Sequence, residues 1–239
     1  MGEALFLLSP MLIAFVLIAV LPKVRRLTAL NGSVAPTFYL AVALHFALFA
    51  NLLTGEIWTN VVRANQAISR EVSGLQSMLR IAEASLGACS IEIQDSVSYY
   101  RKEVVEEEFQ ATATPILRDK IFPLAKLYRL LVIDPEFIPN PTMKSLFRDS
   151  LEQVRASRYE RLELKEARLS PVKLWALYAF GVLTLLAVAV YHCTHGGALV
   201  FTSLLFGCCF SMTLTVISVL DHPYRFPFLV SASPFDRAF

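Results

Sequence analysis

The chain has 239 residues, of which 55% are hydrophobic and 18% are charged, and its formal net charge is +2. Charged residues are missing from three long stretches, and an uncharged apolar stretch of about 18 or more residues is typical of a membrane-spanning helix. This distribution excludes a soluble globular enzyme, a secreted disulfide-bonded domain and a disordered protein, and the near-neutral charge excludes a module that binds nucleic acid.

The first predicted domain, residues 1–58, is a membrane hairpin. Its first span covers residues 4–21. The basic residues follow this stretch instead of preceding it, which is the reverse of a secretory signal peptide, so we interpret it as a span. A short loop closes with the turn pair Asn31-Gly32. The second span covers residues 35–55, and Trp58 follows it as an interfacial anchor.

Residues 59–170 form a polar domain between the second and third spans. Apolar residues recur here at alternating steps of four and three, which predicts helices. The clearest run is a heptad seam, typical of a coiled coil, that begins soon after the second span. The span and the seam are therefore predicted to form one continuous helix. The seam consists of Ile68, Val72, Leu75, Leu79, Ala82 and Leu86.

Three further helices are predicted in the polar domain. The second runs through Ile93–Val104 with the same apolar spacing. The third begins at the cap pair Thr114-Pro115 and continues to Ile133. Residues 134–142 contain three prolines and are predicted to be a loop, and the fourth helix covers residues 143–169.

A second membrane hairpin, residues 171–220, follows with spans over 172–191 and 198–220. The pair Ser170-Pro171 is typical of a helix start. The C-terminal tail, residues 221–239, is predicted to be non-helical, and no segment has the pattern of a strand. The predicted fold class is therefore all-α, with four transmembrane helices and a helical extramembrane domain between the second and third spans.

Lys and Arg near the span ends are more numerous on the side of the polar domain. This excess predicts a multi-pass protein of the cell membrane whose polar domain is cytoplasmic. The cluster of Lys23, Arg25 and Arg26 lies in a short loop on the opposite side and favours the other orientation.

No motif for catalysis or phosphate binding is present in the sequence, so we expect neither an enzyme nor a cofactor. His192 and His195 beside Cys193 are the nearest approach to a metal site. They lack further ligands and are interpreted as turn residues, so no metal is predicted. An acidic cluster is interpreted as a solvated helix face, and a site for a hard cation such as Ca²⁺ is the alternative. It consists of Glu103, Glu106, Glu107 and Glu108.

Six residues of the second span share one helix face and are the candidate pore-lining residues. They are Phe38, Val42, His45, Phe49, Leu52 and Glu56. A polar side chain such as His45 at membrane depth usually faces protein or water. Rings of Phe49 and Leu52 from several subunits would form a hydrophobic constriction, which His45 would tune by pH. The alternative is ordinary packing between spans.

Motifs at the end of the last span, in the tail and in the polar domain resemble those of the bacterial bestrophin-like membrane family. The family closes its last span with Leu-Asp-Arg-Pro-Phe and continues with Val-Ser-Pro-x-Pro-Phe. The tail-motif residues that match are Leu220, Asp221, Pro223, Ser231, Pro234 and Phe235. Weaker matches include Trp58, Glu71 with Leu75, and the helix end Val105–Phe109. His222 replaces the Arg of the family motif, so no role of that Arg is carried over.

The resemblance implies the same four-span layout and a similarity to bestrophins, which are pentameric anion channels whose pores are lined by the second span. The first hypothesis is therefore a homo-oligomeric ion channel for small anions that contacts the lipid bilayer and further copies of itself. The alternative is a membrane-anchored structural or signalling module whose helical domain binds a partner protein.

Overall fold

The structure is a computed structural model that describes residues 2–23, 36–84, 88–109, 124–134, 137–221, 224 and 230–237. Within these ranges all regular elements are helices and no strand occurs, which confirms the all-α prediction. The chain divides into two units, Met1–Thr59 with Arg168–His222, and Asn60–Ala167 with Pro223–Phe239. Each unit has its own hydrophobic core.

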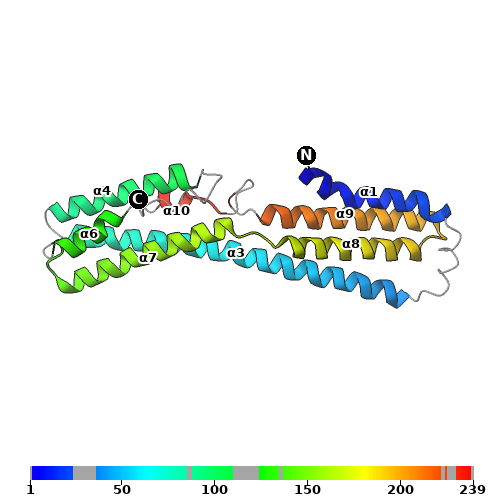
Figure 1. Cartoon of the computed structure of the whole chain (residues 1–239), viewed down its shortest axis with the longest axis horizontal. Coiled ribbons are helices and arrows are strands. Elements are labelled where there is room, and N and C mark those ends of the chain that lie inside the picture. The colour runs from blue at the N-terminus through cyan, green and yellow to red at the C-terminus, as the bar shows by residue number, and fades with distance from the viewer. Residues whose placement is uncertain are drawn as a thin grey trace. The chain divides into compact units, whose positions relative to one another are not determined.

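The first unit contains the apolar helices of the chain, which are labelled α1, α3, α8 and α9 in Figure 1. It consists of α1 (Gly2–Val20), the 3₁₀ turn η1 (Leu21–Lys23), the beginning of α3 (Pro36–Ala84), α8 (Pro171–Tyr191) and α9 (Gly196–Leu220). Helix α9 lies beside both α1 and α8. Among the described residues, α3 from Tyr39 onward, α8 and α9 are long and apolar enough to cross a membrane, and α1 contributes the shorter apolar stretch Phe6–Val20. The assignment of α1 as a fourth span stays a prediction.

Helix α3 is one continuous helix of 49 residues, as the sequence predicted. It begins at Pro36, and no later proline interrupts its hydrogen-bond ladder. Gly74 lets α7 approach closely, because a Cβ atom at Gly74 would lie 2.6 Å from Cγ2 of Val154.

The core of the first unit is rich in aromatic rings, and one of them packs directly against a glycine. Phe210 of α9 is fully buried, and a Cβ atom added to Gly181 of α8 would lie 2.2 Å from its Cζ atom. The Phe210 ring also packs against Phe46 at a centroid distance of 5.3 Å and against Tyr178 at 5.6 Å. Helices α3, α8 and α9 therefore meet at this ring.

The second unit contains the polar helices. It consists of the rest of α3, α4 (Ala88–Glu103), the π-helical turn η2 (Val104–Glu108), α6 (Ala125–Ile133), α7 (Pro141–Glu166) and α10 (Ser233–Arg237). Helix α7 begins at Pro141, two residues earlier than predicted, because Asn140 caps it by accepting hydrogen bonds from the amides of Thr142 and Met143.

The heptad seam of α3 is buried inside the second unit. Ile68, Val72 and Leu75 lie in one core cluster with Val97 of α4 and Leu151 of α7. The apolar stripe is therefore covered by helices of the same chain, and it does not by itself call for a partner helix.

Two predictions about loops and tails have definite outcomes. The tail is not entirely non-helical, because Ser233–Arg237 forms α10, which buries Phe235 in the core of the second unit. Ser170 stands at the N-cap position of α8 as predicted, although its side chain accepts no capping hydrogen bond. The turn Asn31-Gly32 and the helix start Thr114-Pro115 lie outside the described residues.

Candidate functional site

The predicted pore-lining residues of α3 do not share one environment. Part of the stripe faces α8 within the first unit. The Phe49 ring packs edge-on against Phe180 of α8, with ring centroids 5.5 Å apart. The Thr184 hydroxyl, also on α8, lies 3.5 Å from the Val42 carbonyl oxygen. These two positions are therefore covered, at least in part, by the chain itself.

The other members of the stripe are polar or exposed. Glu56 forms an ion pair with Lys173 of α8, with Oε2 and Nζ 2.6 Å apart. His45 and Leu52 lie on the surface of the chain, and 67% of Leu52 is exposed. The side chain of Phe38 lies outside the described residues. The exposed part of the stripe is thus smaller than the sequence indicated.

The imidazole of His45 has a defined hydrogen-bond pattern. Its Nδ1 atom lies 2.7 Å from the carbonyl oxygen of Ala41, one helical turn earlier. A carbonyl oxygen only accepts hydrogen bonds, so the neutral ring carries its proton on Nδ1. Its Nε2 atom then presents a lone pair to its surroundings.

Three of the tail-motif residues make defined contacts at the end of α9 and in α10. Asp221, at the end of α9, accepts a hydrogen bond from the Leu169 amide through Oδ1 at 2.8 Å, and its carbonyl oxygen accepts one from Arg168 at 3.0 Å. Leu220 packs against the core cluster of the first unit that contains Leu169. Phe235 of α10 is fully buried, and its ring packs edge-on against Phe109 at 6.0 Å.

The remaining tail-motif residues are more peripheral. The hydroxyls of Ser231 and Ser233 are 2.9 Å apart, and Pro234 is half-buried. Pro223 and His222 lie outside the described residues. Taken with Asp221 and Phe235, the described part of the motif has a structural role in each unit.

The histidines between α8 and α9 lie at helix ends. His192 is the C-cap residue of α8, and His195 is the N-cap residue of α9, where Nδ1 lies 3.0 Å from the Thr194 hydroxyl. Within the described part of one chain, no group of three His, Cys, Asp or Glu side chains could hold a metal ion.

The interpretation of the acidic cluster as a solvated face is wrong for one of its members. Glu106 and Glu107 are exposed, but only 1% of Glu108 is accessible to solvent. Glu108 ends the π-helical turn η2, which closes with the hydrogen bond from the Phe109 amide to the Val104 carbonyl oxygen at 3.0 Å. Its carboxylate points into the second unit.

Glu108 belongs to a buried ionic network of four charged side chains, which are Glu71 of α3, Glu108 of η2, and Arg158 and Arg161 of α7. Arg161 donates through Nε to Glu71 at 2.8 Å and through Nη2 to Glu108 at 2.6 Å. Arg158 donates through Nε to Glu108 at 2.8 Å. All four side chains are at most 1% exposed.

Three neighbouring groups complete the network. The Tyr100 hydroxyl donates to Glu71 at 2.6 Å, and Lys165 donates to the Glu108 carbonyl oxygen at 2.5 Å. The Arg161 guanidinium lies over the Phe109 ring, with Cζ 5.3 Å from the centroid. A buried charge is costly unless it is paired and hydrogen-bonded, and here each carboxylate binds guanidinium groups directly.

Burial and charge oppose each other within this network. Burial works to raise the pKa of Glu108, but the guanidinium groups of Arg161 and Arg158 outweigh it, so that pKa lies below its usual value. Burial works to lower the pKa of Arg161, but Glu71 and Glu108 raise it well above the usual value. Burial and the Glu71 carboxylate raise the pKa of Tyr100. Glu108 and Arg161 are therefore ionised at neutral pH, and Tyr100 is a neutral donor.

We expect the second unit to lose stability when the pH falls below 4.5, the usual pKa of a Glu carboxyl. The pKa of Glu108 is lower in the folded chain than in the unfolded chain. Its carboxylate therefore stabilises the folded state fully above the unfolded pKa, and this stabilisation is lost as the pH falls through the folded pKa. Urea unfolding of the full chain at a series of pH values measures this slope. The Glu108→Gln variant should have a shallower slope below pH 4.5, and equal slopes would contradict the assignment.

A sequence signal for the network does exist. Glu108 follows the buried Val104 by four residues, and Glu71 lies between the buried Ile68 and Leu75 at steps of three and four. Arg158 and Arg161 continue the apolar face of α7 at the same steps. Charged residues at inward-facing heptad positions on three helices predict a shared buried network, but the spacing does not say which of them pair.

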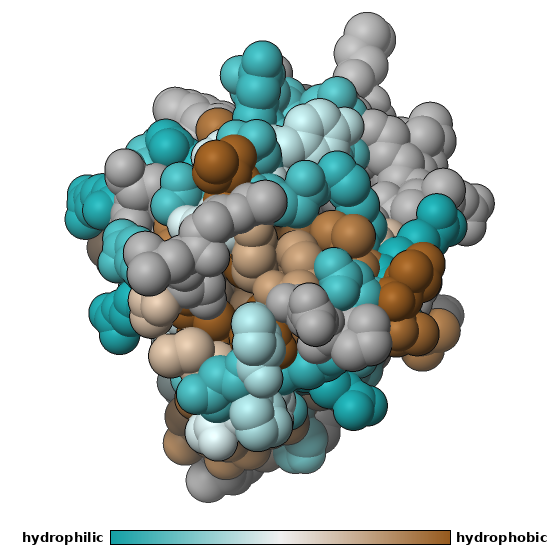
Figure 2. Space-filling model, turned by 90° about the vertical axis from the view of Figure 1, so that its left-hand side faces the viewer, coloured by the Kyte–Doolittle hydropathy of each residue, from teal (hydrophilic) through white to brown (hydrophobic). Residues whose placement is uncertain are grey.

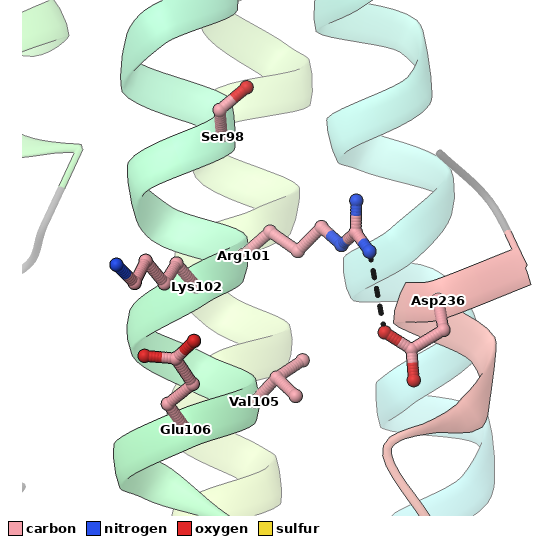
Figure 3. Close-up of a pocket in the computed structure, with 6 residues that line it drawn as sticks. All are labelled: Ser98, Arg101, Lys102, Val105, Glu106 and Asp236. Atoms are coloured by element: carbon pink, nitrogen blue, oxygen red, sulfur yellow. Dashed lines mark hydrogen bonds and ion pairs between the residues drawn. The ribbon is translucent and has the colours of Figure 1, made fainter.

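A small groove of about 260 Å³ lies elsewhere in the second unit, between α4 and α10. Figure 3 shows Arg101 reaching from α4 to Asp236 of α10, with the two side chains 3.4 Å apart, while Lys102 points away from this pair. The rim carries both signs of charge, with Glu106 as the second acid. Because the positive and negative charges balance, the groove does not favour a ligand of either charge. The ion pair between Arg101 and Asp236 links α10 to α4.

Comparison with known proteins identifies the family. The family model for the Bestrophin-like domain matches residues 5–235. The chain belongs to the Bestrophin-like family. No curated protein sequence matches it. As a member of this family it is a membrane protein, in agreement with its long apolar helices.

Solved structures show that this Bestrophin-like chain shares the fold of bacterial bestrophin homologues. Two crystal structures of variants of a bacterial bestrophin homologue from Klebsiella pneumoniae match with a TM-score of 0.70 at 12% sequence identity. One match covers 98% of this chain and 95% of that chain, and the other covers 100% and 96%. A crystal structure described as a membrane protein matches at 13% identity with a TM-score of 0.69, covering 97% of this chain and 94% of that chain.

Proposed function

We propose that this Bestrophin-like protein is a homo-oligomeric ion channel of the cell membrane that conducts small anions through a pore lined by α3. It would cross the membrane with four helices, α1 included, and its polar unit would lie in the cytoplasm. The family membership and the shared fold support this class of function. The surface of α3 provides the physical argument.

The exposed polar groups of α3 at membrane depth are the observation that carries the proposal. Only 17% of the most apolar window of α3 is buried in the chain, compared with 28% for α8 and for α9. His45 and Asn51 lie on this exposed surface. An imidazole or an amide at membrane depth is costly against lipid and usually faces protein or water. A second copy or an aqueous pore would cover both groups.

The structure supports a narrower pore-lining set than the stripe. We propose that Leu52 and His45 face the pore, because they are the described members of the stripe that are exposed and form no ion pair with α8. Phe49 and Glu56 would support the wall from behind, through Phe180 and Lys173. A ring of Leu52 side chains from several copies would form a hydrophobic constriction that resists hydration.

The Leu52→Ala variant is therefore expected to conduct more than the wild type. Removing the isobutyl group widens the proposed constriction and makes it easier to hydrate. The measurement is the single-channel current of the purified full-length protein in a planar bilayer, and reversal potentials in asymmetric salt test the preference for anions. Phe49→Ala should raise conductance less, because the Phe49 ring is partly covered by Phe180.

Leu205→Ala is the matched control for this experiment. Leu205 of α9 is 54% exposed and is also a leucine of an apolar helix, but it lies outside α3. Its replacement should leave the conductance unchanged. If Leu52→Ala and Leu205→Ala behave alike, α3 does not line the constriction, and if no variant conducts, the channel proposal fails.

The alternative, a membrane-anchored module that binds a partner protein, is favoured by a different observation. The second unit exposes large apolar side chains, with Ile91 63%, Val132 82% and Ile133 76% accessible. Figure 2, which faces the side where α4 and α6 are drawn, shows apolar surface among polar side chains. If the purified protein forms a dimer that carries no current, the hypothesis of a membrane-anchored partner-binding module replaces the channel proposal.

A further inference from the structure

The His45 imidazole is unusual for its place in the chain. The sequence from residue 27 to residue 55 contains no Asp, Glu, Lys, Arg or Cys, and His45 is the one histidine within it. It lies on the exposed surface of α3 in the first unit. A strongly polar nitrogen therefore stands alone on an apolar helix face, where it needs a partner.

The chain orients this imidazole as metalloproteins orient a ligand. A metal-binding His almost always donates its second ring N–H to a carbonyl or carboxylate oxygen, which fixes the ring and its tautomer. Nδ1 of His45 makes such a bond to the Ala41 carbonyl oxygen at 2.7 Å. The lone pair of Nε2, the atom that binds a metal ion, is left available.

Nothing that the structure describes around His45 satisfies Nε2. The nearest ring on α8 is Phe180, with centroids 6.5 Å apart, and it offers no donor. The hydroxyl of Thr184 on α8 donates to the Phe180 carbonyl oxygen at 2.8 Å and lies 3.5 Å from that of Val42. Neither side chain is titratable. The partner of Nε2 must therefore come from outside the described part of this chain.

We propose that Nε2 atoms of His45 from neighbouring copies of the chain together bind one transition-metal ion, such as Zn²⁺ or Ni²⁺. This inference rests on the proposed oligomer with α3 around its axis. Symmetry then places one imidazole per copy at the same height, which supplies the several ligands that a single chain lacks among its described residues. Neutral imidazole suits Zn²⁺, Ni²⁺ and Cu²⁺, whereas Ca²⁺ and Mg²⁺ require oxygen ligands.

The test is Zn²⁺ binding to the purified full-length protein in nanodiscs, measured by isothermal titration calorimetry together with the mass of the assembly. The wild type should bind one Zn²⁺ per oligomer, and the ion should reduce the bilayer current. His45→Asn should lose both effects. The Asn amide can still donate to the Ala41 carbonyl oxygen, so this variant removes the ligand atom and keeps the local hydrogen bond.

His195→Gln is the control, because His195 lies at the N-cap of α9. It should bind Zn²⁺ as the wild type does. Equal binding by His45→Asn, or one ion per chain, would overturn the inference. An oligomer that conducts but neither binds nor responds to Zn²⁺ would overturn the metal site and leave the channel intact. A monomer without current would overturn both.

Discussion

Replacing Arg161 with Met is expected to lower the free energy of unfolding of the second unit by about 3–5 kcal/mol, the usual cost of leaving buried charges uncompensated. Arg161 donates to both Glu71 and Glu108, and all three side chains are buried. Met fills much of the same volume but supplies no donor, so two carboxylates would lose a partner in the core. Glu71 would keep only the hydrogen bond from the Tyr100 hydroxyl, and Glu108 would keep its pairing with Arg158, so each would be compensated only in part.

Arg70→Ala provides a matched control on the same pair of helices. Arg70 is adjacent to Glu71 in α3, and its Nη2 lies 2.8 Å from Oε2 of Glu160, which is adjacent to Arg161 in α7. This pair is solvent-accessible, so its removal should cost less than about 1 kcal/mol. Hydrogen exchange of residues 60–109 in the detergent-solubilised full chain measures both effects. Equal losses in the two variants would contradict the distinction between the buried and the exposed pair.

The second large effect is expected at Gly181. A Cβ atom there would lie 2.2 Å from Cζ of Phe210, so Gly181→Ala forces the ring to move. The ring has little room, because it is fully buried and packs against Phe46 and Tyr178. Overpacking of this kind costs about 1–3 kcal/mol. Thermal unfolding in detergent, followed by circular dichroism, should show a lower midpoint for the variant.

A double-mutant cycle separates the steric clash from other effects of Gly181→Ala. Phe210→Leu shortens the side chain that meets the new methyl group, so the double variant should be more stable than the sum of the single effects predicts. Gly55→Ala is the control, since a Cβ atom at Gly55 meets nothing within 4 Å. Simple additivity in the cycle would show that the ring does not limit position 181.

The sequence by itself predicted the long helices and their order, but not the short helix α10. Runs of apolar residues and steps of three and four are local patterns, so they predict where a helix forms without knowledge of its neighbours. The continuous helix α3 and the start of α8 at Pro171 were read in this way. The sequence also contains the family motifs at Asp221 and Phe235, but it does not show which residues they contact.

Only the tertiary structure decided which residues meet. Glu108 was interpreted as part of a solvated acidic face, because its neighbours Glu106 and Glu107 are acidic too, yet it pairs with Arg158 and Arg161. Burial of a charge depends on whether a complementary charge from another helix reaches the same place. That juxtaposition is set by how α3, η2 and α7 pack, and no local pattern encodes it.

The stripe on α3 illustrates the same limit in the first unit. Six residues at helical spacing share one side of the helix, but α8 covers Phe49 and pairs with Glu56 while Leu52 stays exposed. A helix face is defined by about 100° per residue, whereas its environment depends on which neighbours lie against it. The sequence alone therefore determined the candidate face, and the packing of α8 decided which of its residues remain available to a pore or to a second copy.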